Sequence, residues 1–306
     1  LPLLTAFQHP TIAQLARLLQ QQTPRSSQSA LVALQPHGSQ PPLFCVHAIK
    51  GEVHQYYHLA GHLGPALPVY GVQSVGLESS GTLHTRVETM AAHYVTQILE
   101  LQPAGPYRLC GYSFGGIVAF EMAQQLRQQG HRVELLALFD SYLPPREPLG
   151  DRLSRHTEHL SRLSAPQVPG YLWDKAVGNV QTLYRRVCSH SRRLFQTLQC
   201  RLYQALGQPL PLPLQSFYFE QQCYNALQHY TPRVYPGHIT LFRQQAVTWF
   251  NQTVPDLGWR PLAGGGLSLD DIPGGHSAML TEPYVQLLVQ RLRHCLDTAP
   301  VAERDT

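Results

Sequence analysis

The sequence predicts an α/β fold in which a mostly parallel sheet is flanked by helices. Short apolar runs alternate along the chain with segments whose apolar residues recur at helical spacing. Hydrophobic residues make up 43% of the 306 residues and charged residues 14%, which is the balance of a chain with a sizeable core. One apolar run also leads directly into a glycine-rich turn and a helix, at Tyr107–Gln129. Together these features favour one large α/β domain, with helices on both faces of its sheet.

Each predicted element follows from its local pattern. Buried parallel strands typically appear as apolar runs of four to eight residues, flanked by glycine, proline or polar residues. Such runs predict strands at Leu43–His47, Pro68–Val72, Tyr107–Gly111, Val133–Asp140, His238–Arg243 and Leu267–Ile272. Helical periodicity predicts helices at 84–101, Gly116–Gln129 (closed by Gly130) and Tyr284–Leu296.

One long insertion interrupts this alternation. Residues 144–232 contain no convincing strand, but two helical patterns on either side of a proline-rich gap at Gln208–Pro213. An insertion of this length inside a compact domain is usually functional, so we interpret it as a helical lid. Most of its apolar side chains are expected to pack between helices, but their number also suggests a hydrophobic substrate.

Outside the insertion, the predicted organisation has four parts. Residues 5–22 are predicted to form a loop and an amphipathic helix. Residues 23–41 are rich in Ser, Gln and Pro and are predicted to form a linker. The main α/β domain, which includes the insertion, is predicted over 42–297, and residues 298–306 are predicted to form a tail. Because the chain does not begin with Met and has no signal-peptide pattern, we expect a piece of a longer cytoplasmic polypeptide.

Charge and cysteine content narrow the function classes. The net charge is +4, but residues 146–215 hold ten Lys and Arg against four Asp and Glu, which indicates an acidic partner or a solvated helical face. No nucleic-acid recognition motif accompanies this charge, and no apolar stretch is long enough to span a membrane. The six cysteines, at 45, 110, 188, 200, 223 and 295, lack metal-site spacing, so we expect free thiols and no bound metal.

The nucleophile candidate is Ser113, in the segment Gly-Tyr-Ser-Phe-Gly-Gly at 111–116. A strand that runs into a sharp turn and then a helix exposes the serine hydroxyl, and the glycines avoid clashes around it. This context predicts an α/β-hydrolase fold. Within it, the chain order is serine, then acid, then histidine.

The general base and the acid that orients it are assigned from their positions along the chain. His276 lies in a glycine-rich loop between a predicted strand and the last helix, where it could accept the serine proton. Asp140 ends the strand after the nucleophile helix, at the sheet edge where sites of parallel sheets gather. Asp256, twelve residues beyond the next strand, is the alternative acid, whereas Asp270 and Asp271 are too close in sequence to His276.

The oxyanion hole requires two N–H donors. One is expected from Phe114, the residue after the nucleophile, and the other from Ile49 in the loop His47-Ala-Ile-Lys-Gly51. His47 itself is interpreted as structural.

These motifs resemble the type I thioesterase domains that terminate nonribosomal peptide synthetases and polyketide synthases. The resemblance covers residues 30–297 and includes the separation of 27 positions from Ser113 to Asp140, the insertion after the strand that Asp140 ends, and Gly-Gly-His276. The family often has His-Pro-x-Gly-Gly in its first loop, whereas this chain has His-Ala-Ile-Lys-Gly. Phe7–Ala16 is also similar to the last helix of a carrier domain. This similarity implies that residues 1–22 are the C-terminal remnant of such a domain, whose phosphopantetheine-bearing serine would lie upstream.

The resemblance implies a function and its partner. A carrier domain would present an acyl or peptidyl chain on phosphopantetheine, with no cofactor intrinsic to this chain. Ser113 would take the chain as an ester, and water or an internal nucleophile would release it as an acid or a macrocycle. A small-ester hydrolase or lipase, and a non-enzymatic interaction module of the same fold, are the alternatives.

Overall fold

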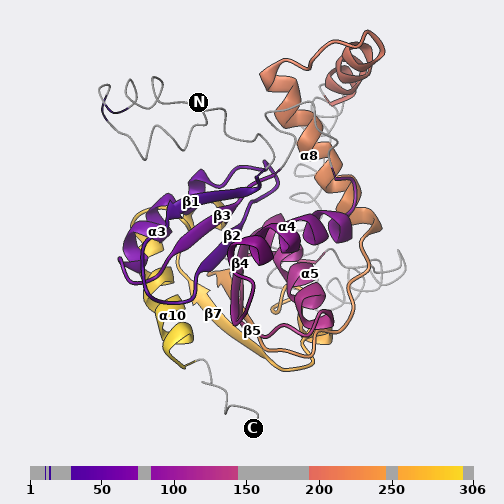
Figure 1. The fold of residues 1–306 in the computed structure, drawn as a ribbon. Coiled ribbons are helices and arrows are strands. Elements are labelled where there is room, and N and C mark those ends of the chain that lie inside the picture. Colours follow the sequence, from indigo (N-terminus) through magenta and orange to yellow (C-terminus); the bar gives the residue numbers. More distant parts are fainter. Residues whose placement is uncertain are drawn as a thin grey trace, which may run out of the picture. The chain divides into compact units, whose positions relative to one another are not determined.

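The computed structural model describes residues 11, 14, 29–74, 84–143, 193–245 and 254–298 (Figure 1). The chain divides into two compact units. The first comprises Leu1–Leu143 with Phe219–Thr306, and the second Pro144–Tyr218. The predicted carrier-like helix falls almost wholly outside the described residues. Its two described residues, Thr11 and Gln14, exchange side-chain to backbone hydrogen bonds of 3.1 and 3.2 Å, the pattern of a helix capping box.

A seven-stranded sheet forms the centre of the first unit, with the strand order β1-β3-β2-β4-β5-β6-β7. Only β1 is antiparallel, where it pairs with β3. The strands are β1 Leu31–Gln35, β2 Leu43–Val46, β3 Val69–Val72, β4 Tyr107–Tyr112, β5 Val133–Phe139, β6 Ile239–Gln244 and β7 Leu267–Ile272. The predicted mostly parallel sheet is therefore confirmed.

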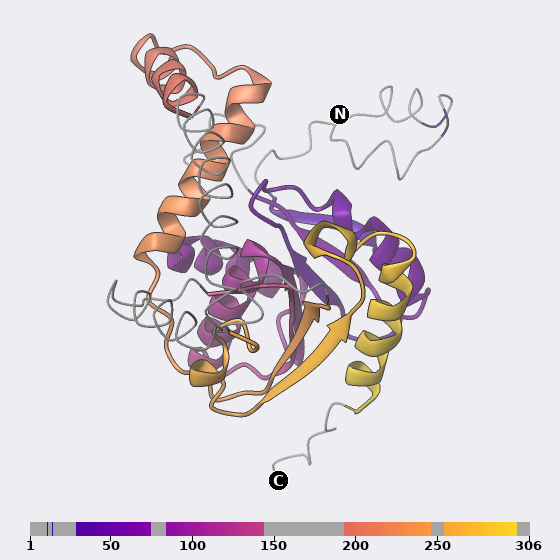
Figure 2. The same cartoon turned by 180° about the vertical axis from the view of Figure 1, so that it is seen from behind.

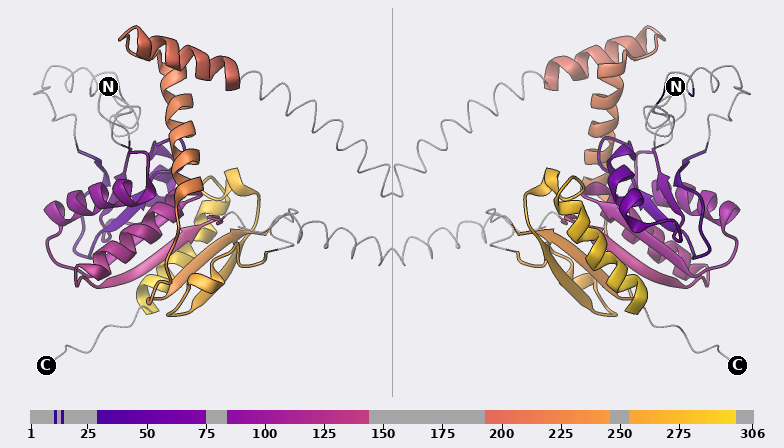
Figure 3. Two further views of the ribbon diagram at one scale, coloured as in Figure 1. Left: turned by 90° about the vertical axis from the view of Figure 1, so that its right-hand side faces the viewer. Right: turned by 90° about the vertical axis from the view of Figure 1, so that its left-hand side faces the viewer.

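Helices cover both faces of this sheet (Figures 1 and 2). α4 (Val87–Leu101) and α5 (Phe114–Gln128) pack on one face, and α3 (Tyr57–Leu63) and α10 (Tyr284–Thr298) pack on the other. The side view separates these two layers (Figure 3). The central strand β2 is completely buried because both of its faces are covered, which explains its unbroken apolar sequence Leu-Phe-Cys-Val.

Two helix ends follow their sequence signals. α5 is closed by Gly130, as predicted, with φ +82° and a hydrogen bond of 2.9 Å from the His131 N–H to the Leu126 carbonyl. α4 buries one face, with side chains at helical spacing: Val87, Met90, Ala91, Tyr94, Val95 and Ile98.

The structure corrects the predicted linker. Leu31–Gln35, which we placed in a linker over 23–41, is strand β1. Ser-, Gln- and Pro-rich flanks obscured this five-residue run, and its place at the sheet edge leaves it only half-buried. The short helix α3 was not predicted either. Its buried residues Leu59, Ala60 and Leu63 are too few to give a clear periodic signal.

The described part of the insertion is helical. A helix covers residues 193–205, and α8 (Leu212–His229) follows. The first helix ends at Gly207, with φ +64° and a hydrogen bond of 2.9 Å from the Gln208 N–H to the Tyr203 carbonyl. Pro213, predicted in the gap, lies in the first turn of α8, where a missing N–H costs nothing. Residues 144–192 of the predicted lid lie outside the described residues.

Candidate active site

The nucleophile turn joins β4 directly to α5. Ser113 has φ 56° and ψ −122°, a backbone conformation that is rare for residues other than glycine. Its N–H donates to the Phe139 carbonyl at 2.9 Å, so the turn is tied to the end of β5. Ser113 is therefore held at the carboxyl edge of the sheet, immediately before the N-terminus of α5.

Three glycines make this turn sterically possible. A Cβ atom on Gly111 would lie 2.1 Å from the Gly115 carbonyl oxygen, and one on Gly115 would lie 2.4 Å from the carbonyl oxygens of Val46 and His47 at the end of β2. A Cβ on Gly116 would lie 2.5 Å from the Cβ of Ser141. Real Cβ contacts are not this short, so the Gly-x-Ser-x-Gly-Gly pattern reflects the close approach of three backbone segments.

Asp140 and His276 are in direct contact. Nδ1 of His276 lies 2.5 Å from Oδ2 of Asp140, whose side chain is 4% exposed. The other oxygen, Oδ1, accepts a hydrogen bond of 3.1 Å from the Gln244 N–H. Asp140 has φ 43°, and its own N–H donates to the Phe242 carbonyl at 2.6 Å. Both carboxylate oxygens are thus engaged, which fixes the orientation of the carboxylate toward the imidazole.

Asp256, the alternative acid, has other partners. Its Oδ1 accepts from the Gly258 N–H at 3.1 Å, and its Oδ2 lies 3.5 Å from the Arg260 guanidinium. The carboxylate therefore stabilises its own loop, and His276 is paired with Asp140 instead.

The loop that carries His276 depends on Gly274, one of the two glycines before it. Gly274 has φ +92°, and a Cβ there would lie 3.0 Å from the ring of Tyr284 at the start of α10. His276 then opens a 3₁₀ turn of three residues, and its side chain is 40% exposed. Contacts from other elements must therefore orient this imidazole.

Tyr112 supplies such a contact, and the sequence did not identify it. Its ring stacks on the His276 ring with a centroid distance of 4.7 Å and an interplanar angle of 27°. Its hydroxyl donates to the His276 carbonyl at 2.7 Å. The only signal in the sequence was an aromatic residue directly before the nucleophile.

The two predicted oxyanion donors follow β2 and β4. Phe114 is the first residue of α5, where helical N–H groups have no acceptor within their own helix. Ile49 is partly buried against the same core as α5, in a loop that the Gly51 N–H closes on the Ala48 carbonyl at 2.9 Å. β2 and β4 are neighbours in the sheet, so the two donors follow adjacent strand ends.

His47 is buried within this loop. Its Nδ1 lies 2.7 Å from the Ala48 carbonyl oxygen and its Nε2 lies 2.7 Å from the Tyr94 hydroxyl. Its side chain is 0% exposed, and burial lowers its pKa to about 4. The ring therefore stays neutral at neutral pH and supports the loop, in accord with the predicted structural role.

This buried imidazole predicts a pH-dependent stability. Between pH 6.5 and 4 the unfolded chain binds a proton on His47 that the folded chain does not, so the free energy of unfolding falls as the pH drops through this window. We expect His47 to contribute about 3 kcal/mol to that fall. Denaturant unfolding at pH 7 and pH 4.5 measures it: His47→Gln should lose less stability between the two values than the wild type. The exposed His229→Gln control should keep the wild-type difference, and an unchanged difference in His47→Gln would assign the effect to another group.

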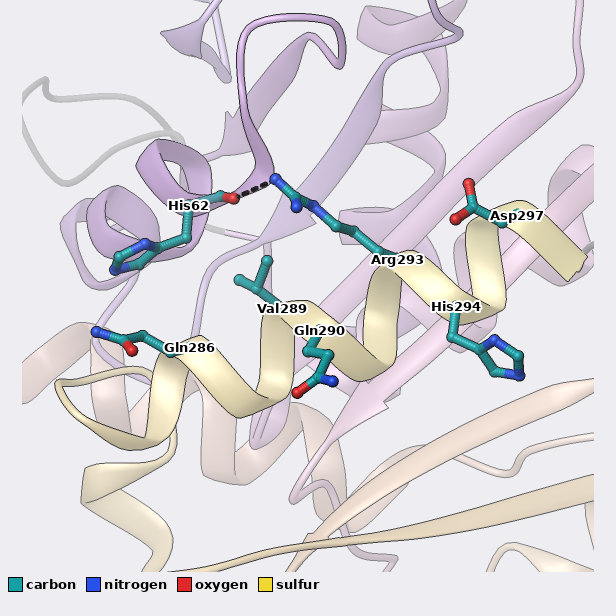
Figure 4. Close-up of a pocket in the computed structure, with 7 residues that line it drawn as sticks. All are labelled: His62, Gln286, Val289, Gln290, Arg293, His294 and Asp297. Atoms are coloured by element: carbon teal, nitrogen blue, oxygen red, sulfur yellow. Dashed lines mark hydrogen bonds between the residues drawn. The ribbon is translucent and has the colours of Figure 1, made fainter.

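A shallow surface pocket lies elsewhere, on α3 and α10 (Figure 4). Arg293 crosses it to donate to the His62 carbonyl at 2.7 Å. The pocket is lined by His62, Gln286, Val289, Gln290, Arg293, His294 and Asp297. None of the predicted site residues is among them.

Three further findings concern metal sites, membrane helices and cysteines. Within the described residues, no group of three or more His, Cys, Asp or Glu side chains could hold a metal ion. In the same part of the chain, no helix is both long and apolar enough to cross a membrane. The described cysteines are free thiols: Cys45, Cys110, Cys200, Cys223 and Cys295.

Comparison with known sequences identifies a family. Residues 41–295 match the family model described as a thioesterase domain. Malpinin synthetase of Mortierella alpina is 33% identical over 304 residues, covering 96% of this chain and 4% of the synthetase. A dimodular nonribosomal peptide synthase of Bacillus subtilis (strain 168) is 33% identical over 287 residues, covering 92% of this chain and 11% of that protein. The chain thus corresponds to a small part of these curated relatives.

Solved structures share the fold. The NocB thioesterase domain, in a covalent complex with a fluorophosphonate nocardicin G analogue, aligns with a TM-score of 0.61 at 22% identity and covers 87% of this chain and 99% of that one. The four-domain nonribosomal peptide synthetase holo-AB3403 aligns with a TM-score of 0.66 at 23% identity, covering 96% of this chain and 22% of that one. These likenesses agree with the parallel sheet and flanking helices of an α/β-hydrolase fold.

Proposed function

This chain belongs to the thioesterase domain family, and we propose that it releases a polyketide or peptide chain from a phosphopantetheinyl carrier through an ester on Ser113. The observation that carries the proposal is the 2.5 Å contact between His276 Nδ1 and Asp140 Oδ2. It orients a base at the same sheet edge as the Ser113 turn, in a chain whose family cleaves thioesters.

Acylation follows from the orientation of the imidazole. Because Nδ1–H donates to Asp140, Nε2 carries the lone pair and accepts the proton of the Ser113 hydroxyl. Oγ then attacks the thioester carbonyl to form a tetrahedral oxyanion. When this intermediate collapses, the carbon–sulfur bond breaks, and the imidazolium returns its proton to the leaving thiolate. The acyl chain is left as an ester on Ser113.

The developing negative charge requires fixed donors. The N–H groups of Phe114 and Ile49 are the proposed pair, with the N-terminus of α5 adding its positive end. Removal of one such donor typically costs about 10²-fold or more in kcat. Lys50 stands in place of the first of the two glycines that are frequent in the family, and Gly51 matches the second.

Deacylation repeats the same proton transfers with a second nucleophile. Water activated by His276 gives a free acid, and an internal hydroxyl or amine of the bound chain gives a ring. Both outcomes pass through the ester on Ser113. The predicted lid over 144–232 would select between them by controlling access of water.

The proposed partner is a carrier domain of the same polypeptide. The two curated synthetases are much longer than this chain and match it over almost its whole length. This supports a carrier domain in the parent protein. The reciprocal hydrogen bonds of Thr11 and Gln14 support a helix start in the carrier-like segment. The basic segment 146–215 would suit an acidic partner of this kind.

The acyl-enzyme is tested by intact-protein mass spectrometry. We expect an acyl-pantetheine thioester, quenched in acid during turnover, and a fluorophosphonate probe each to add one adduct to the wild-type chain. Ser113→Ala should show neither adduct, because it lacks the attacking oxygen. Ser268→Ala, which removes an exposed hydroxyl on β7, should retain both. Adducts that persist in Ser113→Ala would overturn the assignment, and turnover of simple aryl esters far faster than of pantetheine thioesters would favour a small-ester hydrolase.

A further inference from the structure

We propose that Tyr112 is a positioning residue that fixes the imidazole of His276 for proton transfer with Ser113. This inference rests on the function proposed above. Tyr112 is the last residue of β4 and directly precedes the nucleophile. It makes two separate contacts with the histidine: the ring stack at 4.7 Å and the hydrogen bond of 2.7 Å to the backbone carbonyl.

The two contacts restrain motions that Asp140 leaves free. The hydrogen bond from Nδ1 to Asp140 fixes one ring atom, but the imidazole can still tilt about that bond. A stacked aromatic face opposes the tilt and keeps Nε2 directed at one place. The hydroxyl contact fixes the backbone of a three-residue 3₁₀ turn, which has little rigidity of its own.

Tyr112 can act in this way because it is itself anchored. Its N–H donates to the hydroxyl of Tyr56 at 2.8 Å, and that hydroxyl donates to the Val46 carbonyl at 2.6 Å. Tyr56 is completely buried. One hydroxyl group thus joins the end of β2 to the end of β4, just before the loops that carry Ile49 and Ser113.

The state of the Tyr112 hydroxyl suits this role. Burial, and then the charge of Asp140, raise the pKa of Tyr112 above its ordinary value. The phenol therefore remains a neutral hydrogen-bond donor at the pH values at which histidine acts as a base. Its π face also favours the imidazolium that forms in each tetrahedral step.

Two substitutions separate the two contacts. Tyr112→Phe retains the ring and loses the hydrogen bond, and we expect kcat for a pantetheine thioester to fall about 5-fold. Tyr112→Leu loses both contacts, and we expect a fall of about 30-fold. KM should stay within about 2-fold of the wild type in both, because the residue acts on the base and not on substrate binding.

Tyr107→Phe is the matched control. Tyr107 lies at the other end of β4, is buried where Tyr112 is half-buried, and donates its hydroxyl to the Gln102 carbonyl at 2.6 Å. Its substitution removes the same kind of hydrogen bond from the same strand, so thermal unfolding should shift about as much as in Tyr112→Phe. The value of kcat should remain that of the wild type.

A double-mutant cycle with His276→Ala decides whether Tyr112 acts through the histidine. In that background the imidazole is absent, so Tyr112→Leu should change the residual rate by less than about 2-fold. An undiminished 30-fold effect there, or a rise in KM with kcat unchanged, would overturn the positioning role. If Tyr112→Leu does not fold, Tyr112→Phe carries the same cycle, because it removes a single oxygen atom.

The cycle also separates this inference from the proposed function. Wild-type activity in His276→Ala would contradict the catalytic assignment itself. Loss of activity in His276→Ala, together with wild-type kcat in both Tyr112 variants, would contradict only the inference about Tyr112.

Discussion

Asp140→Asn is expected to lower kcat/KM for a pantetheine thioester by about 10⁴-fold. An amide in place of the carboxylate can present its NH₂ group to His276, which favours the tautomer with the proton on Nε2. That tautomer cannot accept the Ser113 proton. The charge that stabilises the imidazolium is also lost.

Asparagine suits this test because of the backbone. Asp140 has φ 43°, and asparagine tolerates this left-handed region better than most residues do. Steady-state kinetics measures the loss, and thermal unfolding checks that the fold persists. Asp256→Asn is the control, because the hydrogen bond of Asp256 to Gly258 and its ion pair with Arg260 lie within its own loop. A large loss in Asp256→Asn with normal rates in Asp140→Asn would exchange the two roles.

Gly115→Ala is expected to destabilise the fold by about 3 kcal/mol. The added methyl group would lie 2.4 Å from the carbonyl oxygens of both Val46 and His47. Neither is the end of a flexible side chain, so α5 would have to move away from β2. The separation of the two proposed oxyanion donors would change with it, and we expect activity to fall as well.

Gly61→Ala provides the contrast. Gly61 lies in α3, and an added Cβ would meet no atom within 4 Å. Alanine is the better helix former, so this substitution should stabilise the chain by about 0.5–1 kcal/mol. Denaturant unfolding compares both variants with the wild type. Equal small effects of the two substitutions would show that the contact between α5 and β2 can relax without cost.

Much of this architecture could be predicted from the sequence because local residue patterns determine it. The parallel strands are buried on both faces and appear as continuous apolar runs, as in Leu43–Val46. Ser113 was recognisable because three glycines must surround a turn of this kind. Asp140 and His276 were placed by strand order, and they are in contact. Their catalytic roles remain predictions.

Other features could not be predicted because their partners are distant in sequence or belong to the backbone. Tyr56 joins the Val46 carbonyl to the Tyr112 N–H, and no side-chain pattern encodes such a link. Trp259 is completely buried and donates its Nε1–H to the Ser141 carbonyl at 2.8 Å, which supports the segment after Asp140. The edge strand β1 is short and half-buried, so it lacks the strong apolar signal of the central strands.

The backbone hydrogen bonds of Ser113 and Asp140, the two site residues with positive φ, have a consequence for the rigidity of the site. The Ser113 N–H is bound to the end of β5, and the Asp140 N–H is bound to β6. Both turns therefore continue the ladder of the sheet beyond its last paired residues. Opening either turn would break strand pairing and so approach the cost of unfolding the central sheet. The groups carried by these two turns are therefore expected to stay as rigid as the core beneath them.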